Sequence, residues 1–133
     1  MARSASRHPT DAELEILKIL WDHGPLGIGA ICEAVRQHRA VATSTVATVL
    51  GVMMDKKQVS RRKSSRGFLW SARLTRDAAA DGLTGELVDR LFDGAGHRLV
   101  AHLFDSGTLS ARDVDRIQDL LDEHRRRAEG DSA

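Results

Sequence analysis

The sequence contains a single cysteine, Cys32, and no apolar run that approaches the roughly 18 residues needed by a membrane-spanning helix. One cysteine excludes an internal disulfide. Residues 1–9 are polar and lack the apolar segment of a signal peptide. We therefore expect a cytoplasmic protein. Because Cys32 falls on the apolar stripe of a predicted helix, we expect it to be an ordinary small core residue.

Residue groups that carry catalysis or hold a cofactor are also lacking. The six histidines are scattered without the spacing of metal ligands. There is no glycine-rich loop of the kind that cradles phosphates. The acidic residues of the C-terminal half fall on helix faces, where they serve as solvating charge. The sequence therefore predicts neither an enzyme nor a cofactor or metal site.

Charge is unevenly distributed, although the net charge of the 133 residues is only +1. Residues 1–75 contain 12 Lys and Arg against 6 Asp and Glu, whereas residues 76–133 contain 8 against 13. Such a split is typical of a polyanion-binding module joined to a part with another task. Chance clustering gives the same totals, so the positions of the charges must decide between the two explanations.

Residues 10–75 predict three helices followed by a hairpin. Thr10 and Glu13 form a capping box that starts the first helix, and the third helix begins near Thr43, with apolar residues at the 3.6-residue period. Alternating residues then predict strands at 58–62 and 67–72. The expected core consists of Leu14, Leu17, Trp21, Ile31, Val35, Val46, Leu50 and Phe68.

The third helix and the segment after it predict binding to nucleic acid. The exposed helix face is small and hydroxyl-bearing, which fits the major groove. Residues 56–66 then hold six basic residues and no acid, so a hairpin there can contact phosphates. The helix face has no Asn, Gln or Arg for bidentate base contacts, so we expect specificity from two half-sites, DNA shape, and Arg61 or Arg66. The predicted DNA-contacting residues are Thr43, Ser44, Thr45, Thr48, Lys56, Arg61, Arg62, Lys63 and Arg66.

Residues 76–127 predict three short helices with narrow apolar stripes, separated by two breaks that contain glycine. Helices of this length cannot bury their stripes alone. They either fold onto the N-terminal module or pair with a second chain, and the glycine breaks favour dimerisation. The predicted dimerisation residues are Leu87, Leu91, Leu99, Val100, Leu103, Phe104, Val114, Ile117 and Leu121.

Together these patterns predict a mainly α fold with a small β-hairpin, in which a winged helix-turn-helix precedes a helical dimerisation domain. The expected parts are a flexible basic arm at 1–9, a DNA-binding domain at 10–75, a dimerisation domain at 76–127 and a polar tail at 128–133. The alternative is a winged-helix module that binds another protein and not DNA. Such a module needs an exposed apolar patch on the third helix or the hairpin, where the sequence has basic residues.

The sequence resembles the penicillinase-repressor family, of the BlaI/MecI/CopY type, from about residue 10 to residue 127. The strongest matches are TDAELEILKILW at 10–21, STVATVL at 44–50, KKQVSRR at 56–62, and LVAHLF at 99–104 followed by LS at 109–110. The resemblance implies a homodimeric repressor of near-palindromic operators. It places residues 43–48 in the recognition helix and residues 61–66 in the wing, and it implies a membrane sensor or a protease as a candidate partner.

Three features depart from the pattern of that family. Lys57 stands where the family usually has a glycine, after the lysine that closes the third helix, and a left-handed residue other than glycine costs about 1 kcal/mol. The C-terminal cysteine cluster of the copper-responsive members is missing, which argues against copper sensing. The Asn-Phe pair at which a sensor protease cuts the β-lactam-responsive members is His102-Leu103 here, so we do not expect induction by that protease.

Overall fold

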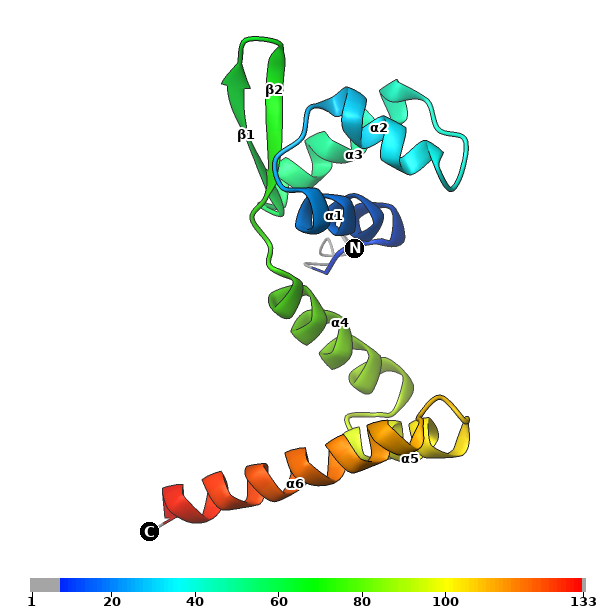
Figure 1. Ribbon diagram of the computed structural model, residues 1–133, viewed down its shortest axis with the longest axis vertical. Helices are drawn as coiled ribbons and strands as arrows, with labels where there is room; N and C mark the ends of the chain where they lie inside the picture. Colours follow the sequence, from blue (N-terminus) through cyan, green and yellow to red (C-terminus); the bar gives the residue numbers. More distant parts are fainter. Residues whose placement is uncertain (1–7, 133) are drawn as a thin grey trace, which may run out of the picture. The chain divides into compact units, whose positions relative to one another are not determined.

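The computed structural model describes residues 8–132, which form six helices and one antiparallel hairpin. The chain divides into two compact units, and the division follows Glu86, inside the helix α4 (Arg76–Leu91). The first unit contains most of α4 together with three complete helices and the hairpin, which are the elements predicted for residues 10–75 (Figure 1). Most of the predicted N-terminal arm, at residues 1–7, lies outside the described residues.

Three helices build the first unit: α1 (Asp11–His23), α2 (Ile28–Arg36) and α3 (Thr43–Asp55). The predicted capping box starts α1, because the Thr10 hydroxyl accepts from the Glu13 N–H at 3.3 Å and the Glu13 carboxylate accepts from the Thr10 N–H at 3.1 Å. Gly24, at φ +76°, ends α1 in a conformation that favours glycine. Helix α3 begins at Thr43, as predicted.

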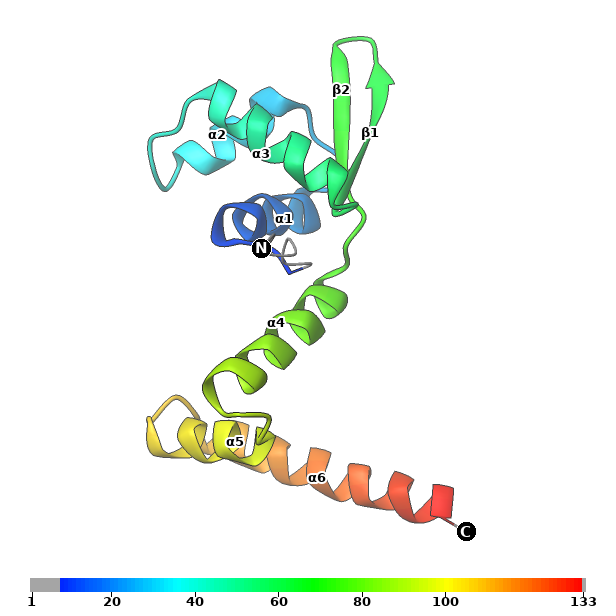
Figure 2. The same ribbon diagram turned by 180° about the vertical axis from the view of Figure 1, so that it is seen from behind.

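The hairpin consists of β1 (Val59–Ser64) and β2 (Gly67–Ala72), joined by a two-residue turn. The register runs from the Val59–Ala72 pair at the base to the Ser64–Gly67 pair at the turn. The strand β1 therefore ends two residues later than the strand predicted at 58–62. Figure 1 shows that the tip of the hairpin projects beyond the three helices. Figure 2, seen from behind, shows the C-terminal end of α3 at the base of the hairpin.

The core lies between the three helices and the base of the hairpin, and it differs in part from the predicted one. Leu17, Ile31, Val35, Val46 and Leu50 are buried, as predicted. The observed core also contains Ile16, Leu20, Cys32, Met53, Val59 and Trp70, so the expectation for Cys32 is confirmed. The core prediction was wrong for Leu14 and Trp21, which are half-buried, and for Phe68, which is 41% exposed.

These differences have physical causes. The buried stripe of α1 begins with Glu13 and continues through Ile16, Leu17 and Leu20. The first buried position is therefore held by a charged residue, Glu13, whereas an apolar pattern alone favours its neighbour Leu14. Phe68 shares a strand face with Trp70, but it pairs with Lys63 only one pair from the turn, farther from the base of the hairpin where the core lies.

The second unit contains the end of α4, α5 (Gly96–Asp105) and α6 (Ala111–Ser132). Side-chain caps start α4 and α6, since the Thr75 hydroxyl accepts from the Ala78 N–H at 3.1 Å and the Ser110 hydroxyl accepts from the Asp113 N–H at 3.1 Å. Residues 128–132, expected to form a polar tail, continue α6 instead. None of the helices in residues 8–132 is both long and apolar enough to cross a membrane.

Candidate nucleic-acid interface

Helix α3 presents a small polar face to solvent. Its apolar side is fixed by the burial of Val46, Leu50 and Met53, one turn apart. The opposite side therefore carries Thr43, Ser44, Thr45 and Thr48, all of them exposed, as predicted. The Thr48 hydroxyl donates to the Ser44 carbonyl at 3.0 Å, and its oxygen can still accept a hydrogen bond. A helix with such short side chains can approach the edges of base pairs closely.

The N-terminus of α3 carries two features that the sequence did not reveal. Its N-cap is Ala42, which has no side-chain atom to satisfy the first helical N–H groups. The guanidinium of Arg36, at the end of α2, donates to the Val41 carbonyl and to the Thr43 hydroxyl, both at 3.0 Å. A cation beside an uncapped helix N-terminus makes this corner attractive to a phosphate. The loop that brings Arg36 back to Thr43 could not be inferred from helical periodicity.

The end of α3 turns into the wing through a left-handed residue. The Gln58 N–H donates to the Met53 carbonyl at 2.9 Å, and the Lys57 N–H donates to the Met54 carbonyl at 3.0 Å. These are the two bonds of a Schellman motif, whose left-handed position is usually glycine. Lys57 occupies it at φ +63°. The left-handed turn therefore forms without glycine, and β1 begins two residues after Lys57, at Val59.

A buried ion pair ties this corner to α1. The Glu13 carboxylate accepts from the Lys56 ammonium at 3.0 and 3.1 Å and from the Gln58 side-chain amide at 3.2 Å. Burial by itself raises the pKa of Glu13. The hydrogen bonds from Thr10, Lys56 and Gln58 outweigh that effect and hold its pKa below the ordinary value.

Lys56 lies in this ion pair and differs in this from the exposed cations of the wing. Its ammonium is engaged by a carboxylate that is only 5% exposed, and the Lys56 side chain is itself 19% exposed. The sequence prediction counted Lys56 among the DNA-contacting residues because it opens the basic run. The geometry makes Lys56 a residue that holds the corner between α3 and β1, and we leave it out of the proposed interface.

The wing carries the remaining predicted cations, and all of them are exposed: Arg61, Arg62, Lys63 and Arg66. Strand alternation places Arg61 and Lys63 on one face of β1 and Arg62 on the other, while Arg66 lies in the turn. The Arg61 guanidinium covers the Phe68 ring, with its central carbon 4.0 Å from the ring centre. Positive charge therefore surrounds the tip of the hairpin, which directly follows α3 in the chain.

The second unit offers a different kind of surface, since none of its described side chains is buried. Leu87, Leu91, Val100, Phe104, Val114 and Leu121 are exposed, and Leu99, Leu103 and Ile117 are half-buried. Phe104 is 46% exposed, and Leu120, which was not among the predicted dimerisation residues, is 63% exposed. Neighbouring apolar side chains left this open are typical of an interaction surface.

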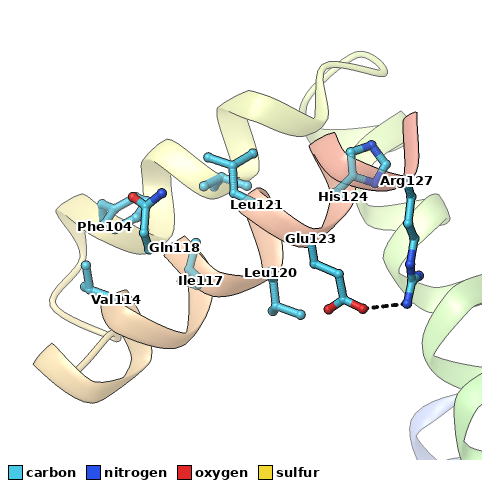
Figure 3. Close-up of a pocket in the computed structure, with 10 residues that line it drawn as sticks. Phe104, Val114, Ile117, Gln118, Leu120, Leu121, Glu123, His124 and Arg127 are labelled. Atoms are coloured by element: carbon cyan, nitrogen blue, oxygen red, sulfur yellow. Dashed lines mark hydrogen bonds and ion pairs between the residues drawn. The ribbon is translucent and has the colours of Figure 1, made fainter. Parts of the chain in front are cut away.

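A groove between α5 and α6 collects several of these side chains. Val100 and Phe104 line it from α5, and Val114, Ile117 and Leu121 line it from α6. Figure 3 shows this groove, with the ion pair between Glu123 and Arg127 (2.6 Å) toward the end of α6. Five of the nine predicted dimerisation residues thus share one apolar groove.

Three helices followed by a basic hairpin form a winged helix-turn-helix, which defines the class of winged-helix DNA-binding regulators. The family model described as penicillinase repressor matches residues 9–123. The chain belongs to the penicillinase repressor family, whose members are DNA-binding transcriptional repressors and not enzymes.

Individual relatives agree with this membership. The chain is 20% identical to the penicillinase repressor of Bacillus licheniformis over 118 residues, which cover 89% of this chain and 92% of that protein. It is 27% identical over 112 residues to an uncharacterized 16.5 kDa protein in the ptsI 3′ region of Latilactobacillus sakei, with 84% of this chain and 77% of that protein covered. The solution structure of the DNA-binding domain of the repressor BlaI superposes with a TM-score of 0.50 at 20% identity, over 57% of this chain and 93% of that domain. This likeness shows the winged-helix fold.

Proposed function

We propose that two copies of the chain bind one near-palindromic operator and thereby repress transcription. In this proposal α3 enters the major groove of each half-site with Ser44, Thr45 and Thr48 toward the bases. The wing contacts the sugar-phosphate backbone through Arg62, Lys63 and Arg66. The observation that carries the proposal is the exposed, acid-free basic hairpin that follows directly on a helix with a small hydroxyl-bearing face.

The apolar groove of the second unit supports the dimer in this proposal. Joining two heads raises the effective concentration of the second head once the first is bound, often increasing affinity about 100-fold or more. A helix face without bidentate base readers benefits most from this gain. A symmetric dimer also matches a near-palindromic operator, because each half-site then meets an identical head.

The wing can be tested by the salt dependence of DNA binding. The probe is a duplex that the wild-type chain selects from a random-sequence library. The operator sequence therefore need not be known in advance. Arg62→Ala with Arg66→Ala should lower the slope of log K against log salt by about 0.9 for each lost phosphate contact. Lys18→Ala, which removes an exposed cation of α1, is the matched control and should leave the slope unchanged.

The DNA-binding hypothesis and the protein-binding hypothesis predict different results in this experiment. A DNA-binding wing yields enriched sequences and a reduced slope in the double variant. If no sequence is enriched, DNA binding is contradicted and the protein-binding module is favoured. If a sequence is enriched but the slope is the same in all three proteins, the wing does not contact phosphates.

A further inference from the structure

Arg61 differs from the other exposed cations of the wing because it is stacked on two aromatic rings. Its guanidinium carbon lies 4.0 Å from the centre of the Phe68 ring and 5.5 Å from that of the Trp70 ring. Arg61 pairs with Trp70 across the hairpin, and Phe68 is the diagonal neighbour on the same face. Within the described residues, the side chains of Arg62, Lys63 and Arg66 form no ring contact, hydrogen bond or ion pair.

Phe68 has no evident part in the core. Its side chain is 41% exposed, whereas that of Trp70 is 7% exposed and belongs to the core cluster. Trp70 also anchors the hairpin, since its backbone N–H donates to the Leu26 carbonyl at 2.8 Å. A large aromatic residue left open near the tip of a basic hairpin therefore needs another explanation, and the guanidinium above it provides one.

The rings leave the donors of Arg61 available to other groups. A ring against the guanidinium limits its orientations, while the five N–H groups lie in the plane of the guanidinium itself. Among residues 8–132 no acceptor engages these donors. Two parallel in-plane donors suit a pair of acceptors, such as two phosphate oxygens or O6 and N7 of guanine. An arginine already held in one orientation also loses less rotamer freedom when it binds.

We propose that Phe68 is a positioning residue that holds Arg61 for a directed, two-donor contact with DNA. Arg62, Lys63 and Arg66 then supply general attraction to phosphates, while Arg61 supplies the oriented contact of the wing. This inference rests on the proposed DNA binding, and it assigns a role to an aromatic residue that contacts no DNA itself. It explains why the hairpin keeps an exposed ring beside its basic residues.

A double-mutant cycle on the full-length chain tests the coupling between the two residues. The probe is the labelled duplex selected by the wild-type chain. Phe68→Leu keeps an apolar side chain but removes the flat ring, and should weaken binding about three- to tenfold. In the Arg61→Ala background the same change should have almost no effect, because the group that it positions is gone. Phe68→Tyr keeps the ring and should restore wild-type affinity to within about twofold.

A second measurement separates positioning from loss of structure. NMR should show the Arg61 side-chain protons shifted by ring currents in the wild type and in Phe68→Tyr, and less shifted in Phe68→Leu. The thermal unfolding midpoint should stay the same in all three, since Phe68 lies outside the core. Equal effects of Phe68→Leu with and without Arg61, or Arg61 protons without a ring-current shift in the wild type, would overturn the proposal.

Comparison with a scrambled duplex of the same composition identifies the acceptor. If Arg61 contacts a guanine, Arg61→Ala should lower affinity for the selected duplex far more than for the scrambled one. If it contacts a phosphate, both affinities should fall by the same factor and the salt slope should decrease. Failure of the wild type to select any duplex would instead overturn the proposed function itself, so the two failures are distinguishable.

Discussion

At the scale of single residues, Lys57 and Glu13 fix the corner between the recognition helix and the wing. Lys57 holds a left-handed turn at φ +63°, and Glu13 binds Lys56 and Gln58 on either side of it. Neither residue reaches DNA in our proposal. Both set where the wing begins relative to α3, so their energetic effects should appear in stability.

Replacing Lys57 with glycine should stabilise the protein. A side chain at positive φ costs about 1 kcal/mol, and glycine removes that cost while the two Schellman hydrogen bonds remain. We expect the free energy of unfolding to rise by about 1 kcal/mol in urea titrations. Lys57→Ala is the control, because it removes the charge but keeps the Cβ atom, and it should give no gain. Equal gains in both variants would show that charge and not backbone strain is responsible.

The buried ion pair predicts a dependence of stability on pH. Because the folded pKa of Glu13 lies below the ordinary value of 4.5, its contribution is fully present above that pH. The contribution is lost as the pH falls through the folded pKa and Glu13 takes up a proton. Glu13→Gln should therefore lower the free energy of unfolding by about 2 kcal/mol at pH 7 and flatten its decline in acid.

Glu15→Gln provides the matched control for this prediction. Glu15 also forms an ion pair, with Arg39 at 2.9 Å, but the Arg39 side chain is 49% exposed and that of Glu15 is 25% exposed. Ion pairs open to solvent contribute little to stability, so Glu15→Gln should change the free energy of unfolding much less than Glu13→Gln. If urea titrations showed the same decrease in the free energy of unfolding for both variants, burial would not make the Glu13 ion pair more stabilising than the Glu15 pair.

At the scale of elements, the order and type of helices and strands followed from the sequence because local signals agree with the fold. The capping box at Thr10 forms as predicted. The apolar stripe of α3 is buried as predicted, which leaves its hydroxyl-bearing face open. Partners in space were less accessible, because no periodicity shows that Lys56 meets Glu13 or that Arg61 covers Phe68.

The assignment of the α3 face can be tested by adding a charge to it. Thr48→Glu places a carboxylate on an exposed position that faces DNA in our proposal, and like-charge repulsion with phosphates should weaken binding at least about tenfold. Thr48→Gln has nearly the same size without the charge and should cost much less. Circular dichroism should show both variants folded. Unfolding of Thr48→Glu alone would mean that the helix faces are wrongly assigned.

At the scale of the whole molecule, the second unit of a single chain leaves much apolar side-chain surface exposed. Its apolar stripes were predicted from helical periodicity, and the structure leaves them open, with Leu91 66% exposed. Sequence periodicity shows that a stripe exists but not what covers it. A second copy is the cover we propose, because the groove between α5 and α6 and the open end of α4 require a partner of matching apolar character.

Charged substitutions in the groove test this role. Phe104→Asp with Leu121→Asp should convert the dimer to monomers in sedimentation velocity at micromolar concentration. The first unit should keep its fold, since neither residue belongs to its core. Affinity for the selected duplex should fall about 100-fold as the effective concentration of the second head is lost. Asp122→Ala with Asp119→Ala, outside the groove lining, should change neither property.

Sedimentation velocity of the wild-type chain with the selected duplex tests most directly whether the protein acts as a dimer on DNA. The protein and the labelled duplex are mixed at increasing ratios, and the mass of the complex gives the number of chains bound. We predict two chains on each duplex, with the enriched sequences arranged as an inverted repeat of two half-sites. A complex that saturates at one chain on each duplex, or the absence of any complex, would contradict the proposal.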